Sequence, residues 1–301
     1  MKTTTLIIPV ANCASQLTHL LTDLKRQSYR DFEVIFIDHH SCDQTPQQLR
    51  AFQRLSGIPC QIIDVRRQQT LWDSFNHGLP YAHGDAVMFL TPETRLHAFH
   101  LERLVALDSP IAGFHSWPVT FTGHPALLNA FLTQQLPPTV IGTRFNRSSL
   151  AGLTFDSKLG SLAPSWLFYQ ALRRSDQAAF IVPPTAPMTN PTTITVLPQY
   201  RETLNYLGQL QHDLETTAPA LLSAVWHHHH YQLSSVYQQI RRLPFNSRQL
   251  YSEELRQLKM TIRQIEQDKL AFSQPYRFRS WVNRRFNNHV VTYATHTSTV
   301  S

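Results

Sequence analysis

Polar residues with chemical potential follow three apolar runs in the first third of the chain. They are Asp38 to Asp43, Asp64 to Arg67 and Thr91 to Thr94. Carboxylates accept hydrogen bonds from hydroxyl groups and bind hard cations such as Mg²⁺, and nearby arginines can neutralise a phosphate. If the apolar runs are neighbouring strands, these segments indicate one site for a polar, charged ligand.

A second candidate is the run of four histidines from His227 to His230, which follows Trp226. His227 and His230 would share one face of a helix, and imidazoles are good ligands for borderline metals. No cysteine or carboxylate lies close in the sequence to complete a ligand set. The run is therefore interpreted as a polar helix surface or a hydrogen-bonding lid over a crevice, with metal binding as the alternative.

The elements that would position the polar segments alternate along the chain. Apolar runs rich in β-branched residues predict strands at 4–10, 32–37, 60–65 and 86–90, and helical patterns cover 17–24, 48–55 and 71–81. This alternation predicts an α/β fold with a mostly parallel sheet covered on both faces. Ligands of such sheets bind outside the carboxyl ends of the strands, so Ala11 and the three polar segments should converge on one crevice.

The sequence changes character from about Gln199. Ser252 begins a helical stripe with 3,4 spacing, formed by Leu255, Leu258, Ile262, Ile265 and Phe272. The stripe fits a helix laid on the domain or a self-associating coiled coil. Further on, arginines surround an apolar face at 277–286, which fits either an interfacial amphipathic helix or a basic helix packed on its own domain. We expect a domain at 1–198, a basic helical extension at 199–290 and a disordered tail at 291–301.

The composition of the 301 residues, 42% hydrophobic and 16% charged, is that of a globular protein. Residues 240–301 hold eleven Lys or Arg and four Asp or Glu, an excess that accounts for the whole formal charge of +7. Such a segment favours an anionic partner, for example a membrane surface.

Three cysteines without CxxC spacing indicate neither a disulfide framework nor a zinc site. With no apolar run long enough to span a membrane and no signal peptide, we expect a cytoplasmic protein, peripheral at the inner face of the membrane.

Three segments of the chain resemble glycosyltransferase family 2. They are LIIPVANCASQLTHLLTDLKRQSYRDFEVIFIDHHSCDQT, LWDSFNHGLPYAHGDAVMFLTPET and RFNRSSLAGLTFDSKL. The first is similar to the family's opening pattern, IIPVYN followed by a helix and QTYxDFEIIVVDDGSTDxT, and the resemblance extends over about residues 4 to 195. It implies a GT-A fold and a nucleotide-sugar donor.

The resemblance assigns nucleotide contacts at the first two strand ends. Pro9 and Ala11 belong to the first motif, where the family usually has an aromatic residue at the place of Ala11. Asp38 matches the first of two paired aspartates and can accept a hydrogen bond from a ribose hydroxyl. His39 stands at the second aspartate, where the family contacts the base. A structural alternative for Asp38 is a strand-end residue that bonds the following loop.

Further positions fall near the phosphates and a cation. Asn76 keeps its family residue, Phe75 stands where a basic residue is frequent, and Arg66 could compensate. In the family, a DxD motif holds the divalent cation, Mn²⁺ or Mg²⁺, that neutralises the leaving diphosphate. Here Thr91 and Glu93 occupy that motif, and one carboxylate makes a poor cage for either ion.

The proton-transfer and acceptor positions come from the third region. Ser165 stands at the place of the family's catalytic base, and a serine lacks a suitable pKa for that role. Asp156 is the nearest acid, at an ordinary position upstream. Trp166 can offer an aromatic face to a sugar ring, although such residues are more often part of a core.

Two functions therefore stay open. The first is a transferase that extends a cell-surface or exported glycan, held by its basic helices near an anionic membrane or a lipid-linked acceptor. The second is a regulatory or scaffolding partner of an active glycosyltransferase, favoured by replacements at 11, 39, 75, 91 and 165 that affect base, phosphate, cation and proton transfer separately. Nucleic-acid binding has no recognised motif to support it.

Overall fold

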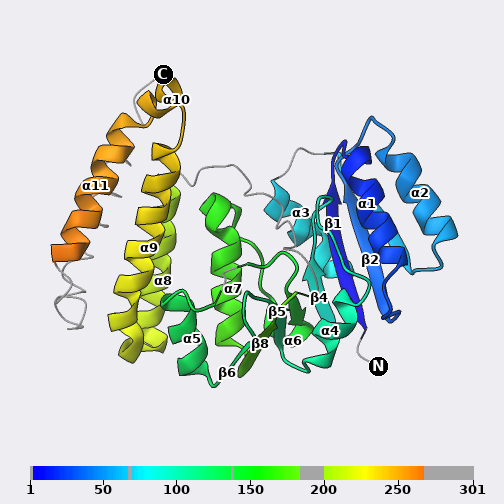
Figure 1. The fold of residues 1–301 in the computed structure, drawn as a ribbon, viewed down its shortest axis with the longest axis horizontal. Helices are drawn as coiled ribbons and strands as arrows, with labels where there is room; N and C mark the ends of the chain where they lie inside the picture. Colours follow the sequence, from blue (N-terminus) through cyan, green and yellow to red (C-terminus); the bar gives the residue numbers. More distant parts are fainter. Residues whose placement is uncertain (1–2, 67–69, 137–138, 184–199, 268–301) are drawn as a thin grey trace. The chain divides into compact units, whose positions relative to one another are not determined.

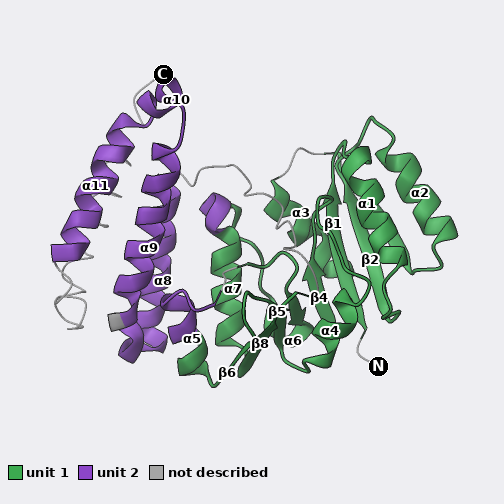
Figure 2. Ribbon diagram, in the orientation of Figure 1, with its two compact units in different colours: residues 1–127, 137–157, 163–195 green, residues 128–136, 158–162, 196–301 purple. Residues whose placement is uncertain are grey.

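The computed structural model describes residues 3–66, 70–136, 139–183 and 200–267. They form two compact units (Figure 2). Unit 1 contains residues 1–127, 137–157 and 163–195, and unit 2 contains residues 128–136, 158–162 and 196–301.

Unit 1 is built on a single mixed sheet, in which the described strands follow the order β3-β2-β1-β4-β7-β5-β8-β6. Strands β1 to β4 are mutually parallel, β7 runs antiparallel to both β4 and β5, and β6 runs antiparallel to β8. The strands are β1 (Thr4–Val10), β2 (Phe32–Asp38), β3 (Cys60–Asp64), β4 (Ala86–Phe89), β5 (Ile111–Phe114), β6 (Val119–Thr122), β7 (Arg144–Asn146) and β8 (Gln177–Ile181).

Helices cover both faces of this sheet (Figure 1). Apolar side chains of α1 (Ala14–Lys25), α2 (Thr45–Leu55) and α4 (His100–Ala106) share one core with alternate residues of β1 and β2. On the opposite face, α3 (Leu71–Gly78) brings Phe75 against Phe89, and α7 (Ala163–Arg173) brings Phe168 against Phe145. The predicted α/β fold is confirmed. The other helical elements up to residue 183 are η1 (Leu79–Tyr81), α5 (His124–Leu132), α6 (Arg147–Leu150) and η2 (Ser157–Leu162).

Two element boundaries differ from the sequence pattern for local reasons. The helix expected at 71–81 ends at Gly78 and continues as the 3₁₀ turn Leu79–Tyr81, because Pro80 has no N–H to extend an α-helix. A Cβ on Gly78 would lie 2.5 Å from Ile7 Cγ2, so glycine allows α3 to approach the sheet closely. Helix α2 begins earlier than expected, at Thr45, since Pro46 suits a first helical turn.

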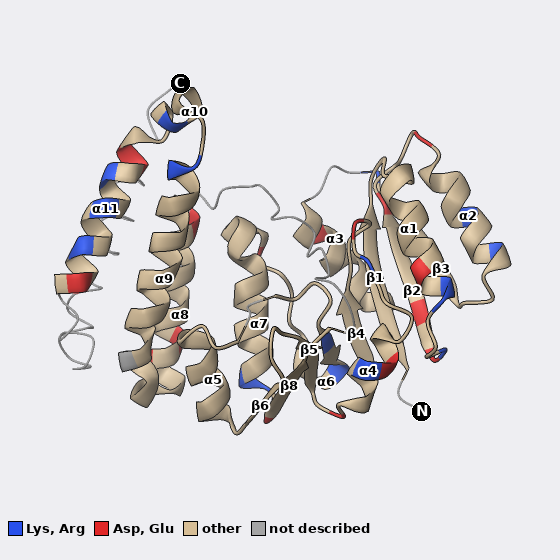
Figure 3. Cartoon of the chain, viewed as in Figure 1, with Lys and Arg blue, Asp and Glu red and all other residues tan. Residues whose placement is uncertain are grey.

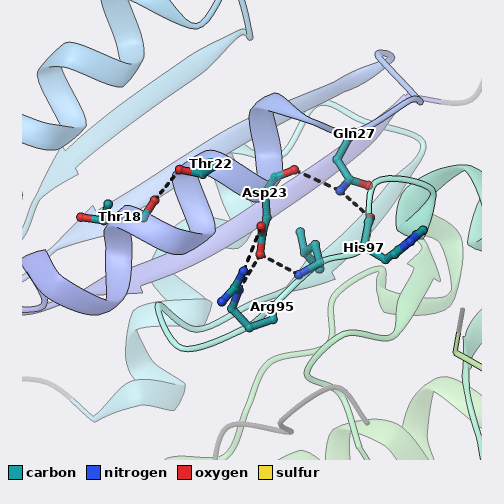
Figure 4. Close-up of polar contacts among 7 residues, drawn as sticks. Thr18, Thr22, Asp23, Gln27, Arg95 and His97 are labelled. Carbon is teal, nitrogen blue, oxygen red and sulfur yellow. Dashed lines mark hydrogen bonds and ion pairs between the residues drawn. The ribbon is translucent and has the colours of Figure 1, made fainter. Parts of the chain in front are cut away.

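A buried carboxylate of α1 holds the segment that follows β4 (Figure 4). Asp23 accepts hydrogen bonds from Arg95 Nε at 2.7 Å and from the Leu96 N–H at 3.1 Å. One turn later, the Gln27 amide donates to the His97 carbonyl at 2.8 Å. These bonds fix the course of the chain just after Thr91 to Thr94.

The described helices of unit 2 form a bundle, in which α11 packs against α9. The Trp226 indole donates to the Ile265 carbonyl at 2.9 Å, and Leu258 and Ile265 are fully buried. Charged residues of both signs lie along α11 (Figure 3). Up to Ile265, the stripe therefore lies on a helix packed against its own unit; Phe272 lies outside the described residues, and self-association stays a prediction. The helices are α8 (Tyr200–Thr217), η3 (Pro219–Leu221), α9 (Leu222–Arg241), α10 (Phe245–Gln249) and α11 (Ser252–Gln267).

The amphipathic segment expected at 277–286 and the tail at 291–301 lie outside the described residues. Among the described helices, none is long and apolar enough to cross a membrane.

The histidine run lies in α9, and its two central members are in the core of unit 2. His228 and His229 are fully buried, and burial lowers the pKa of each to about 3. His228 Nε2 lies 2.7 Å from the Tyr206 hydroxyl, and its Nδ1 accepts from the Gln134 amide at 2.9 Å. The expected polar surface is therefore wrong at these two positions, because four consecutive residues of a helix face nearly every direction and two of them face the interior.

Candidate functional site

The carboxyl ends of β1 to β4 lie along one edge of the sheet because these strands are parallel. Two backbone hydrogen bonds continue the sheet beyond the strand ends. The His39 N–H donates to the Val10 carbonyl at 3.0 Å, and the Val65 N–H donates to the Asp38 carbonyl at 2.8 Å. The structure thus brings Asp38 to Asp43 together with Asp64 to Arg66, with Ala11 exposed beside them, while Arg67 lies outside the described residues.

The loops after β1 and β2 are interlocked by side chains. Asn12 donates its N–H to Ser41 Oγ at 2.9 Å, and its Oδ1 accepts from the Cys42 N–H at 2.8 Å. Asp43 accepts from the Ala14 N–H at 3.1 Å, which caps the start of α1. A ligand at this edge would meet loops that are already ordered by the protein itself.

Asp38 is buried and uses one carboxylate oxygen for its own loop. Its Oδ1 accepts from the Ser41 N–H at 3.1 Å and from the Ser41 hydroxyl at 2.6 Å. Its Oδ2 has no hydrogen bond to a described residue and can accept one from a ligand hydroxyl. Asp38 therefore has the loop-bonding role that the sequence left as an alternative, and it keeps an acceptor for a ligand.

His39 and its neighbours line the next part of the edge. His39 Nε2 lies 2.6 Å from Ser74 Oγ, whose hydroxyl donates to the Thr70 carbonyl at 2.8 Å. His40 Nδ1 lies 3.8 Å from the Asp64 carboxylate, and both side chains are more than half exposed, so this pair contributes little. Arg66 is exposed after the end of β3.

Asn76 and Phe75 take part in the packing behind this edge of the sheet. The Asn76 amide donates to the Phe155 carbonyl at 2.8 Å and accepts from the Phe155 N–H at 2.7 Å. Phe75 is fully buried, with its ring centroid 5.0 Å from Phe89 and 5.6 Å from Phe155. The aromatic ring therefore belongs to the core at this place, and Asn76 fixes the chain segment at Phe155. Pro9 is likewise buried, inside β1.

The donor set after β4 does not fit a protein-built cation cage. Thr91 is buried, its hydroxyl lies 3.3 Å from the Thr94 hydroxyl, and its N–H donates to the same oxygen at 3.0 Å. Glu93 is exposed. Within the described ranges, no group of three His, Cys, Asp or Glu residues could hold a metal ion.

The proton-transfer position falls at the start of α7. Ser165 is buried, and Asp156 lies half-buried upstream of it. Trp166 is half-buried and stacks on Tyr169, with ring centroids 5.5 Å apart and planes at 27°. A buried serine hydroxyl offers no basic group for a proton transfer.

The exposed aromatic residue Trp117 lies at this edge, and the sequence pattern did not indicate it as a site residue. Strand β5 runs parallel to β4 because β7 is antiparallel to both, so the residues after Phe114 reach the same edge. There Trp117 is 56% exposed, and its ring packs edge-on to His115 with centroids 4.1 Å apart. A short apolar run before Trp117 was the only available signal for β5. Ser41 and Ser74, which hold Asp38 and His39, were also not anticipated.

Solved structures with this arrangement define the class of the fold. The crystal structure of S. aureus TarS 1–349 matches with a TM-score of 0.58 at 14% identity, covering 91% of both chains. Mannosyltransferase PcManGT from Pyrobaculum calidifontis matches with a TM-score of 0.56 at 16% identity, covering 92% of this chain and 85% of the other. The fold is that of the GT-A glycosyltransferases, as the sequence predicted.

The N-terminal third of the sequence is similar to known glycosyltransferases. Residues 5–108 match the family model described as Glycosyl transferase family 2. The amylovoran biosynthesis glycosyltransferase AmsB of Erwinia amylovora is 28% identical over 108 residues. A PGL/p-HBAD biosynthesis glycosyltransferase of Mycobacterium bovis is 32% identical over 92 residues. The matched region spans 36% of the length of each of these relatives and about a third of this chain.

Proposed function

We propose that the protein binds a nucleotide sugar at the edge formed by β1 to β4 and transfers its sugar in the biosynthesis of a cell-surface or exported glycan. The observation that carries this proposal is Asp38, whose Oδ2 stays available in a loop that Ser41 and Asn12 hold in place. A preordered acceptor of this kind binds a ribose hydroxyl without first paying for loop ordering.

The comparisons support the ligand class. TarS has been solved in complex with UDP and with UDP-GlcNAc, and PcManGT in complex with GDP-Man and Mn²⁺. The two curated relatives are named as glycosyltransferases of amylovoran biosynthesis and of PGL/p-HBAD biosynthesis. We propose Ala11, His39, Arg66 and Asn76 as the further surroundings of the nucleotide, with Asn76 acting through the Phe155 segment.

The acceptor would lie on the β5 side of the same edge. Trp117 is the exposed aromatic residue there, and an indole face packs well on the C–H face of a pyranose. Trp117→Ala should raise the KM for the acceptor about tenfold and leave the KM for the donor unchanged, which initial-rate measurements would show. An equal rise in both constants would remove Trp117 from the acceptor site.

A second candidate is a binding partner of an active glycosyltransferase without turnover of its own. Specific observations favour it: Ser165 is buried at the base position, and Phe75 is part of the core where a basic residue would face the phosphates. In this case the crevice binds nucleotide, and the helices of unit 2 serve association.

Calorimetric titration with UDP, GDP, CDP and ADP, with and without Mn²⁺, tests the proposal. We expect binding of at least one nucleotide and a loss of about tenfold or more in Asp38→Asn, which keeps the Oδ1 bond to Ser41 and turns Oδ2 into a donor. Ser41→Ala is the matched control for loop disruption. If no nucleotide binds the wild-type protein, the transferase proposal is wrong. Binding without transfer to any glycan acceptor would favour the second candidate.

The basic segment at 240–301 supports a location at an anionic membrane surface. Deletion of 275–301 should reduce sedimentation with phosphatidylserine vesicles, and the effect should weaken at high salt. Unchanged partition would contradict a membrane role for the segment.

A further inference from the structure

A short chain of hydrogen bonds fixes the proton on the His39 ring. A serine hydroxyl has one proton to donate, and the Thr70 carbonyl can only accept. The Ser74 proton therefore goes to Thr70 at 2.8 Å, and Ser74 Oγ accepts from His39 Nε2 at 2.6 Å. This hydrogen-bond network assigns the Nε2–H tautomer to the neutral imidazole of His39.

Ser74 and Thr70, which hold the His39 ring, are themselves held in place by burial and by hydrogen bonds. Ser74 is 1% exposed, and Thr70 begins α3 with a reciprocal capping box, in which Asp73 accepts from the Thr70 N–H and donates its own N–H to Thr70 Oγ1 at 3.1 Å. On the other side, the backbone of His39 is tied to Val10. The ring is therefore fixed through both its backbone and its Nε2 atom.

The second ring nitrogen is left for a ligand. In the Nε2–H tautomer, Nδ1 carries a lone pair and no proton, so it can only accept. Nδ1 makes no hydrogen bond to a described residue, and it is not among the buried atoms that lack a partner. It is therefore a solvent-accessible acceptor, next in sequence to Asp38 at the carboxyl end of β2.

We propose that this acceptor selects the base of the donor, an inference that rests on the proposed function. Uracil and guanine carry a proton on the ring nitrogen of their pairing edge, and that N–H can donate to His39 Nδ1. Cytosine and adenine have a lone pair at the same ring nitrogen, which would face the Nδ1 lone pair. The site therefore takes uridine or guanosine diphosphate sugars in preference to cytidine or adenosine ones.

Two measurements at about pH 8, where histidines are generally neutral, test the selection. The first is the ¹⁵N spectrum of the histidine rings in the free protein, with His39→Leu for assignment, and we expect the Nε2–H tautomer. The second is calorimetric titration, in which UDP or GDP should bind about tenfold more tightly than CDP and ADP, the effect of one hydrogen bond. His39→Leu should reduce this preference to about twofold or less, and the exposed His19→Gln should leave it intact.

The variant Ser74→Ala tests whether the fixed tautomer, and not merely the imidazole ring of His39, selects the base. This variant keeps the His39 ring but removes the hydroxyl that accepts from Nε2–H. Both neutral tautomers should then be populated in the ¹⁵N spectrum, and the preference for UDP or GDP over CDP and ADP should decrease. Equal binding of all four nucleotides, or an Nδ1–H tautomer in the wild-type protein, would overturn the selection while the proposed function stands. Failure of every nucleotide to bind would overturn both.

Discussion

His100 makes unit 1 sensitive to acid. It is fully buried against Phe114, with ring centroids 4.6 Å apart, and neither ring nitrogen has a hydrogen-bond partner among the described residues. Burial, with a smaller contribution from His97, lowers its pKa to about 3. An unfolded histidine has a pKa of about 6.5. Above that value both states are neutral, and as the pH falls from there toward 3 only the unfolded chain takes up a proton, so stability declines.

The loss of stability depends on how far the pH lies below the pKa of an unfolded histidine. Each pH unit below about 6.5 costs about 1.4 kcal/mol per histidine, so His100 should lower the stability of unit 1 by about 2 kcal/mol at about pH 5. His100→Leu fills a similar volume and removes the titrating group. The difference in unfolding free energy between variant and wild type should therefore grow by about 2 kcal/mol from pH 8 to pH 5 in favour of the variant.

Hydrogen exchange in denaturant is the suitable assay, because peptides from 86–114 report on unit 1 separately from unit 2. His228 and His229, which lie in unit 2, are present in both proteins and cancel in the difference. His19→Gln, an exposed substitution on α1, serves as a control for the pH dependence. A difference between variant and wild type that is constant from pH 8 to pH 5 would refute the reasoning.

Three further predictions concern other parts of the chain. Asp23→Ala should cost about 2–3 kcal/mol in denaturant unfolding because it strands a buried N–H, and Asp23→Asn should cost less since it keeps one acceptor; equal losses would contradict this. Gly160 has φ 52° and ψ −125°, and a Cβ there would meet the Glu202 carboxylate, so Gly160→Ala should lower stability by about 1–3 kcal/mol. Gly57→Ala, at φ 69° with open space around it, should lower the free energy of unfolding by only about 1 kcal/mol. Thermal melts of the two variants would compare these losses, and a larger loss for Gly57→Ala would contradict the prediction. In the folded protein, iodoacetamide should modify the exposed Cys42 first, whereas burial raises the pKa of Cys60 to about 12 and should protect it; mass spectrometry that finds Cys60 modified first would contradict this.

The first half of the sheet could be predicted because its strands are continuous apolar runs separated by helical patterns. Strand β1 has the expected bounds, Thr4–Val10, and β2 differs by one residue at its end. The second half could not, since β5 and β7 have four and three residues and their pairing depends on partners far away in the sequence. Burial of His228 in α9 could not be foreseen either, because its partners, Gln134 and Tyr206, are supplied by other segments of the chain.

For the candidate site, the sequence predicted where polar residues gather but not what they contact. The parallel order of β1 to β4 is enough to bring Asp38 and Ala11 to one edge. The partners of Asn76 and His39, which are Phe155 and Ser74, lie 79 and 35 residues away along the chain. Hydrogen bonds of this range depend on the folded backbone, so no local pattern indicates them.

The contacts of Asp38 and His39 also concern the question of whether a protein that binds a nucleotide sugar would transfer its sugar. Ser41 and Ser74 hold Asp38 and His39 in one arrangement before any ligand arrives, which favours binding of the ground state. Rate acceleration requires groups that stabilise charge or accept a proton only in the transition state. The positions expected to supply such groups hold a buried Ser165 and a Thr91 whose hydroxyl lies beside that of Thr94. Under the proposed function, affinity for a nucleotide and rate of transfer would be set by different residues, and each has to be measured on its own.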